Sequence, residues 1–167
     1  AFDLDTRFRM VKESGVYDYY DKTPESLEQA DEYLAASEKY DLPIRAGGWF
    51  YRLGQDEQLL KQKLEFSAAL GSTVHNTQIL MHHADGHLVS NDEVVALYLQ
   101  AAEWGDACGC YPTFEVHINM WSEDFRRITQ VADAVERRGV PFRMTLDHSH
   151  VIFKIDNPEE QEILDIR

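Results

Sequence analysis

Segments typical of β-strands alternate with segments typical of α-helices along the whole chain, and this alternation constrains the fold more than any other feature. The expected strands begin near residues 16, 43, 73, 111 and 141, so a strand with its helix recurs about every 30 residues. Strict alternation predicts a parallel sheet with helical cover, because parallel strands need a long crossover between them. Two architectures meet this pattern: part of a (β/α)₈ TIM barrel or, as the alternative, an open doubly wound parallel sheet.

Glycine, proline and capping residues mark where the elements begin and end. Thr23-Pro24 predicts the start of one helix, Ser90 with Glu93 has the spacing of a capping box, and Ser122 is expected to cap the helix that precedes Gly139. The five expected strands are, in order, VYDYY (16–20), IRAGGWF (44–50), TVHNTQILM (73–81), YPTFEVHI (111–118) and PFRMTLDHSHV (141–151).

The length of the chain decides how much of a barrel it can form. It has 167 residues, whereas a whole TIM barrel needs about 250. Five βα units therefore predict a partial barrel, strands 2 to 6, as a single domain over 1–167 that is truncated at both ends. Ala1 without an initiator Met, and a helix that begins at Asn157-Pro158 and is not finished, favour this interpretation. Open sheet edges would then favour a partner, and a homo-oligomer is one candidate.

The charge of the chain excludes some partners. The chain has 16 Lys and Arg and 30 Asp and Glu, which gives a formal net charge of −14. A charge of this sign repels phosphate backbones and anionic membranes. We therefore expect no nucleic acid and no membrane as partner. Cys108 and Cys110 are too few for a disulfide scaffold, so reduced thiols and a cytoplasmic location are expected. Neither a phosphate-binding glycine loop nor a serine-hydrolase elbow is present in the sequence, which disfavours nucleotide-dependent transfer and serine hydrolysis.

Chemically active side chains gather at the carboxyl ends of the expected strands, where parallel α/β folds place their sites. Six of the seven histidines, all but His75, lie at or just beyond a strand end. Glu115 stands in an otherwise apolar strand, and alternation puts Thr113, Glu115 and His117 on one face. Asp147 ends the next strand, and His150 follows it in a D-x-x-H pattern.

Two carboxylates at the same end of neighbouring strands repel each other unless they share a proton or a cation. Glu115 and Asp147 are therefore candidate ligands of a divalent metal. The alternative is a buried ion pair with an arginine such as Arg45 or Arg143.

The remaining candidates carry weaker signals. Trp49 follows Gly47-Gly48 and could stack against a sugar ring, or it could simply pack in the core. His75 lies within a strand and is expected to be a hydrogen-bonded core residue. The histidines of the loop HHADGH (82–87) are compatible with either a solvated loop or a functional one.

The segment PTFEVHINMWSEDF, followed about 30 residues later by PFRMTLDHSHV, resembles the xylose-isomerase-like TIM barrels, which include sugar isomerases, epimerases and endonuclease-IV-type enzymes. In that family a Glu ending the fifth strand and an Asp ending the sixth bind a divalent metal, with a His and a Glu from the last two strands. Glu115 and Asp147 match the first two. His150 matches a His that contacts substrate in the epimerases and a second metal in the endonucleases.

The resemblance implies a metal-dependent isomerase or epimerase, or a related lyase, that moves a proton next to a carbonyl of a small sugar-like substrate. It implies Mn, Mg, Co or Zn as the metal and Glu115 as ligand and base together. His150, His117 and Trp49 are the expected substrate contacts. The alternatives are an endonuclease-IV-like phosphodiesterase, which the negative charge disfavours, and a non-catalytic barrel subunit that binds a partner.

Overall fold

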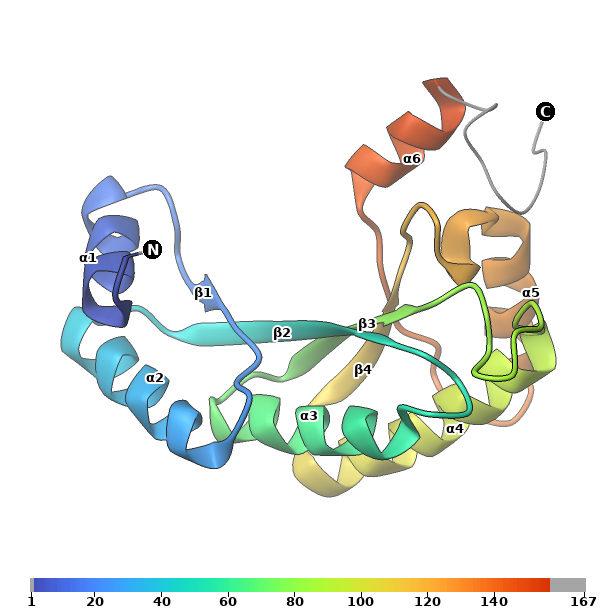
Figure 1. The fold of residues 1–167 in the computed structure, drawn as a ribbon, viewed down its shortest axis with the longest axis horizontal. Coiled ribbons are helices and arrows are strands. Elements are labelled where there is room, and N and C mark those ends of the chain that lie inside the picture. The colour runs from blue at the N-terminus through green and yellow to red at the C-terminus, as the bar shows by residue number, and fades with distance from the viewer. Residues whose placement is uncertain (1, 157–167) are drawn as a thin grey trace.

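Five parallel strands in sequential order form the single sheet of this protein, seen in a computed structural model that describes residues 2–156 (Figure 1). The elements are α1 (Leu4–Ser14), β1 (Tyr20–Asp21), α2 (Leu27–Tyr40), β2 (Ile44–Tyr51), α3 (Glu57–Ala69), β3 (Val74–Ile79), α4 (Asn91–Cys108), β4 (Tyr111–Glu115), the 3₁₀ turn η1 (Trp121–Glu123), α5 (Phe125–Glu136), β5 (Met144–Thr145) and α6 (His148–Asp156). The helix expected from Asn157 lies outside the described residues.

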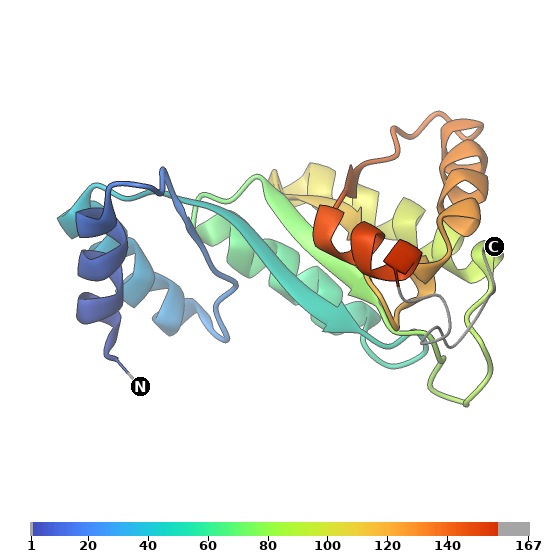
Figure 2. The same cartoon turned by 90° about the horizontal axis from the view of Figure 1, so that it is seen from above.

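The order of the strands distinguishes the two expected architectures. Each strand pairs in parallel with the next strand in sequence, from β1 through β5. A doubly wound sheet reverses its strand order at a switch point, whereas a barrel is wound in one direction. Helices α2, α3 and α4 run along one face of the sheet, and α6 stands on the other side (Figures 1 and 2). The fold is therefore the wall of a barrel, and the doubly wound alternative was wrong.

The main core lies between the sheet and the helices on its outer face. Alternate strand residues and one stripe of each helix fill it, and their burial supplies the hydrophobic stabilisation of the fold. Its buried side chains include Leu60, Leu64, Val94, Tyr98, Phe114 and Trp121. A smaller cluster around Phe8 and Tyr33 joins α1 to α2. None of the helices within residues 2–156 is both long and apolar enough to cross a membrane.

Several element boundaries differ from the expected ones because capping side chains act elsewhere. Ser26, not Thr23, caps α2, and the Thr23 hydroxyl instead accepts a hydrogen bond from the Gly48 N–H at 2.7 Å. Asp124, not Ser122, caps α5. The capping box of Ser90 and Glu93 is confirmed.

Two strands are much shorter than expected. The first covers only Tyr20–Asp21, and the last ends at Thr145 rather than at Val151. Helix α6 begins at His148 because the Asp147 carboxylate accepts hydrogen bonds from the backbone N–H (2.8 Å) and the hydroxyl (2.6 Å) of Ser149.

His75 is fully buried on β3, as the sequence predicted. Its Nε2 lies 2.6 Å from the Tyr51 hydroxyl, and its Nδ1 lies 3.0 Å from the Ser67 hydroxyl. Burial, with a smaller effect of the nearby Lys63 cation, lowers the pKa of His75 to about 3. The imidazole is therefore neutral in the folded protein over the physiological range of pH.

This neutral histidine predicts a loss of stability in acid. As pH falls, the unfolded chain binds a proton at His75 near pH 6.5, whereas the folded chain binds one only near pH 3. The contribution is therefore fully present above pH 6.5 and is lost between 6.5 and 3. Protonation of His75 in the unfolded chain should lower the free energy of unfolding by about 2 kcal/mol between pH 7 and pH 5, as measured by urea unfolding. His75→Gln should flatten this slope, while the exposed control His82→Gln should keep it. An unchanged slope in His75→Gln would disprove the assignment.

Candidate metal centre

Three predicted side chains converge at the carboxyl edge of the sheet. Glu115 ends β4, Asp147 precedes α6, and His150 lies in the first turn of that helix. One ligand atom from each lies within 4.8 Å of the other two. Helix α6, which carries His150, stands on the side of the sheet opposite α3 and α4, the side that would face the inside of a barrel.

Glu115 is a buried carboxylate that accepts a hydrogen bond from a neutral amide. Its side chain is 8% exposed, and Gln78 of β3 donates a hydrogen bond from its Nε2 to the Glu115 Oε2 at 2.5 Å. Burial raises the pKa of Glu115, and the charge of Asp147 raises it further. Within residues 2–156, no Arg or Lys forms an ion pair with Glu115, and Arg143 instead lies 3.7 Å above the Tyr111 ring. The buried ion pair considered as the alternative is therefore not formed.

Asp147 and His150 come together because a helix begins between them. With Asp147 Oδ1 occupied by Ser149, Oδ2 lies 3.6 Å from His150 Nε2, one helical turn away. The hydrogen bonds from Ser149 lower the pKa of Asp147, so it remains ionised. Burial lowers the pKa of His150, with the neighbouring His117 adding to the effect. His150 thus offers a neutral imidazole, the form that binds metals and accepts hydrogen bonds.

His117 stands beside this cluster on the segment after β4. Its Nδ1 lies 2.6 Å from the Ile118 carbonyl. Because a carbonyl can only accept, the Nδ1 donates this hydrogen bond, and the lone pair of the Nε2 remains available. The ring centroids of His117 and His150 are 3.8 Å apart. Ser122 fixes the segment: its hydroxyl donates to the Glu115 carbonyl at 2.6 Å and accepts from the His117 N–H at 3.1 Å. The role of Ser122 is therefore to hold the site rather than to cap α5.

Two further residues of the site were missed by the sequence analysis. Gln78 holds the Glu115 carboxylate, and its own Oε1 is buried without a hydrogen-bond partner among residues 2–156. Phe50 of β2 sets its exposed ring edge-on to His117, with centroids 5.9 Å apart. The alternation of polar Asn76 and Gln78 in TVHNTQILM was the available signal for a polar inner face.

A polar network lies beneath the cluster on the same face of the sheet. The hydroxyls of Thr113 and Thr145 both donate to the Asn76 Oδ1, at 2.9 and 2.6 Å. These bonds join the inner faces of β3, β4 and β5 and keep polar groups satisfied where the barrel interior would lie.

Trp49 lies apart from the three converging residues. Its indole ring is 41% exposed, and the Lys63 Nζ of α3 lies 5.1 Å from the ring centroid. It borders a groove of about 370 Å³ at the ends of β1, β2 and β3, together with Phe50, Asn76 and Gln78. Contact between Trp49 and a substrate stays a prediction.

The donor set fits a divalent metal. Two carboxylate oxygens and one imidazole nitrogen suit Mn²⁺, Co²⁺ or Zn²⁺, and a cation between them would remove the repulsion of Glu115 and Asp147. Three ligands leave coordination positions for additional protein ligands and for substrate oxygens.

Comparisons with known proteins identify the fold. No protein-family model and no curated protein matches the sequence. Among solved structures, a xylose isomerase domain containing protein from Salmonella typhimurium LT2 superposes over 100% of this chain and 63% of its own, with a TM-score of 0.72 and 17% identity. 3-Keto-D-glucoside 4-epimerase from E. coli superposes over 95% of this chain and 68% of its own, with a TM-score of 0.70 and 15% identity.

A third similar structure is D-allulose 3-epimerase from Methylomonas sp., in complex with D-allulose. It covers 89% of this chain and 57% of its own, with a TM-score of 0.69 and 16% identity. At these identities the similarity shows the fold alone. The chain has the fold of part of a TIM barrel, as these structures do, and spans about three fifths of the structures that it matches.

Proposed function

We propose that the protein is a divalent-metal-dependent isomerase or epimerase that moves a proton next to a carbonyl of a small sugar-like substrate. One observation carries the proposal: Glu115, Asp147 and His150 converge on the inner face of a partial barrel whose fold is that of sugar epimerases and isomerase-domain proteins. A related lyase would use the same residues, and the reaction product distinguishes the two.

Each residue of the site has a chemical role in this proposal. A bound divalent metal would supply a Lewis acid that polarises the substrate carbonyl. Glu115 takes the proton from the neighbouring carbon, because burial raises its pKa and so makes its carboxylate a better base. In an isomerisation the same carboxylate returns the proton to the adjacent carbon, whereas an epimerisation needs a second proton donor on the opposite face of the substrate. Gln78 keeps that carboxylate in one orientation. His150 would complete the protein ligands of the metal, and His117 hydrogen-bonds a substrate hydroxyl through its Nε2.

The groove beside the cluster supports a polyhydroxylated substrate. Its volume of about 370 Å³ is in the range of small-molecule sites. Asn76 and Gln78 offer amides for hydroxyl groups, while Phe50 and Trp49 offer apolar ring faces for the carbon skeleton. The matched epimerases act on D-allulose and on 3-keto-D-glucosides by their names, and we extend that substrate class to this protein.

Solvent proton exchange tests the proposed function directly. The Mn²⁺- or Co²⁺-loaded protein is incubated in deuterated water with a panel of keto-sugars, and NMR follows the carbon next to the carbonyl. We expect deuterium to enter that position of at least one substrate, because the abstracted proton equilibrates with solvent. Omission of the metal is the control. No exchange across the panel, with metal bound, would reject the isomerase or epimerase assignment, and cleavage of abasic-site DNA would favour the phosphodiesterase alternative.

A further inference from the structure

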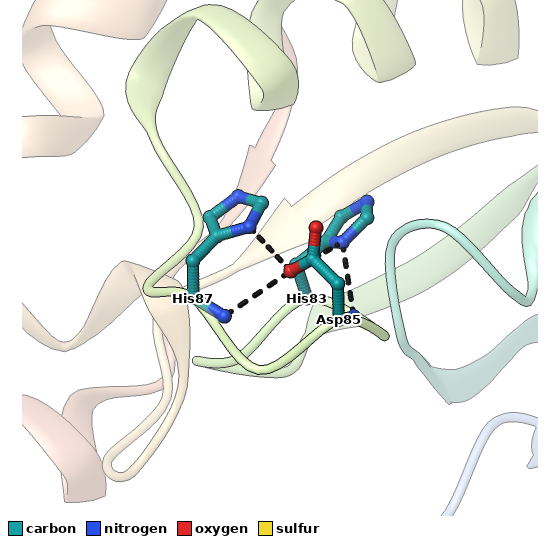
Figure 3. A group of neighbouring side chains, drawn as sticks. All are labelled: His83, Asp85 and His87. Carbon is teal, nitrogen blue, oxygen red and sulfur yellow. Dashed lines mark hydrogen bonds and ion pairs between the residues drawn. The ribbon is translucent and has the colours of Figure 1, made fainter.

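The loop between β3 and α4 carries a second cluster of metal-binding side chains, separate from the first. Within this loop the His83 N–H donates to the His87 carbonyl at 2.9 Å, and the Gly86 N–H donates to the His83 carbonyl at 2.9 Å. Gly86 has a φ of 97°, which permits the tight turn. The turn sets the side chains of His83, Asp85 and His87 on one side (Figure 3).

The two imidazoles of this cluster aim at a single carboxylate oxygen. Their rings are stacked with centroids 4.6 Å apart and planes inclined by 20°. The Nδ1 atoms of His83 and His87 lie 3.1 and 2.5 Å from the Asp85 Oδ1. One ligand atom from each of the three residues lies within 4.8 Å of the other two. A pair of imidazoles and a carboxylate in this arrangement matches the ligands of borderline divalent metals.

The hydrogen bonding of His83 leaves a lone pair inside the cluster. The Asp85 N–H donates to the His83 Nδ1 at 3.3 Å, so this nitrogen acts as an acceptor. The same nitrogen faces the Asp85 Oδ1, another acceptor, at 3.1 Å. Two facing acceptors repel each other unless a proton or a cation lies between them.

The second nitrogen of His87 faces a carboxylate outside the three-residue cluster. Its Nε2 lies 2.8 Å from the Oε1 of Glu93, in the first turn of α4. The other oxygen of Glu93 accepts hydrogen bonds from the N–H (2.7 Å) and the hydroxyl (2.6 Å) of Ser90. A carboxylate that holds the outer nitrogen of a histidine is the usual outer partner of a metal-binding histidine, because it orients the ring and increases its basicity.

Residues of the segment after β2 also fix the position of this loop. The Ala84 N–H donates to the Leu53 carbonyl at 2.8 Å. Gly54, with a φ of 81°, lies so close to the His83 ring that a side chain at Gly54 would collide with it. The Ala84 hydrogen bond and the close contact at Gly54 thus hold the ligand residues in place, which lowers the entropy lost on binding an ion.

We propose that His83, Asp85 and His87 bind a second divalent transition-metal ion of the Zn²⁺ class, with Glu93 as the outer carboxylate that orients His87. The site shares no residue with the Glu115 cluster and has two nitrogen donors rather than one. A bound ion would fasten the loop after β3 to the amino end of α4. With three protein ligands, a tetrahedral ion keeps one position for water.

The experiment isolates this site from the first one. In the double variant Glu115→Gln with Asp147→Asn, Zn²⁺ is titrated by calorimetry, and Co²⁺ is titrated by its visible absorption. About one ion per chain is expected to remain bound, with the intense bands of a tetrahedral Co²⁺ site. Adding His87→Gln or Asp85→Asn should weaken binding at least a hundredfold, and Glu93→Gln about tenfold.

Matched controls separate a built site from adventitious binding. His82→Gln, an exposed histidine of the same loop, should leave the affinity unchanged. Circular dichroism melts check that each variant is folded. The proposal is overturned if the double variant binds no ion, if His87→Gln binds as tightly as its parent, or if His82→Gln weakens binding equally. Absence of sugar exchange would reject the proposed function and leave this site standing, because the two readouts are independent.

Discussion

Replacing Glu115 by Gln is expected to lower the rate of solvent proton exchange into the substrate by a factor of about a thousand or more. The substitution keeps the size of the side chain and removes both its charge and its basicity. A positioned general base contributes roughly 10²- to 10⁴-fold to a rate, and the lost carboxylate also removes one metal ligand. The measurement combines NMR exchange rates with the metal content of the purified variant.

The matched control for this prediction is Glu65→Gln on the outer surface of α3, which makes the same chemical change at an exposed position. It should retain the parent rate and metal content. If Glu115→Gln kept the parent exchange rate, Glu115 would be neither base nor ligand. If it lost the rate but kept the metal, Glu115 would act as the base alone, and Asp147 and His150 would be sufficient to hold the ion.

Trp121→Ala is expected to cost about 3–5 kcal/mol of unfolding free energy, the largest stability effect that we anticipate. The Trp121 side chain is 1% exposed and packs in the main core within the turn η1. The Arg127 guanidinium lies 5.3 Å from the ring centroid. Truncation would leave a large cavity beneath the turn, which close packing cannot fill. Urea unfolding at neutral pH measures the effect.

Trp121→Phe separates the loss of volume from the loss of the indole N–H. Within residues 2–156 the buried Nε1 of Trp121 has no hydrogen-bond partner, so its removal breaks no bond. We therefore expect Phe to cost clearly less than Ala. The Ala variant should also bind the metal less tightly, because Ser122 in the same turn holds both the Glu115 carbonyl and the His117 N–H. Equal costs for Phe and Ala, or no loss of stability in either, would show that the ring is not a packing element.

The architecture was largely predictable because hydrophobic periodicity and crossover geometry are properties of the chain itself. The order of strands and helices followed from apolar runs separated by capping residues, and the capping box of Ser90 and Glu93 was found as predicted. The convergence of Glu115 and Asp147 was also predictable, because neighbouring parallel strands bring their carboxyl ends to one edge. A metal between them remains a prediction.

The start of α6 was not predictable from the local sequence. Residues TLDHSHV read as the end of a strand, yet Asp147 caps a helix there, and this cap is what sets His150 one turn away from the carboxylate. Residues with strong turn and capping chemistry compete with strand formation, and the tertiary environment decides between the two.

The sequence by itself determined that the protein is a strand–helix repeat with acids and imidazoles at its strand ends, since these features depend on residues near one another in the chain. Only the tertiary structure decided which side chains meet. The register that sets Gln78 against Glu115 and the edge-on contact of Phe50 with His117 depend on how separate segments are positioned. The free energy of such a contact depends on two residues that are distant in the sequence, and which residues meet is known only once the chain is folded.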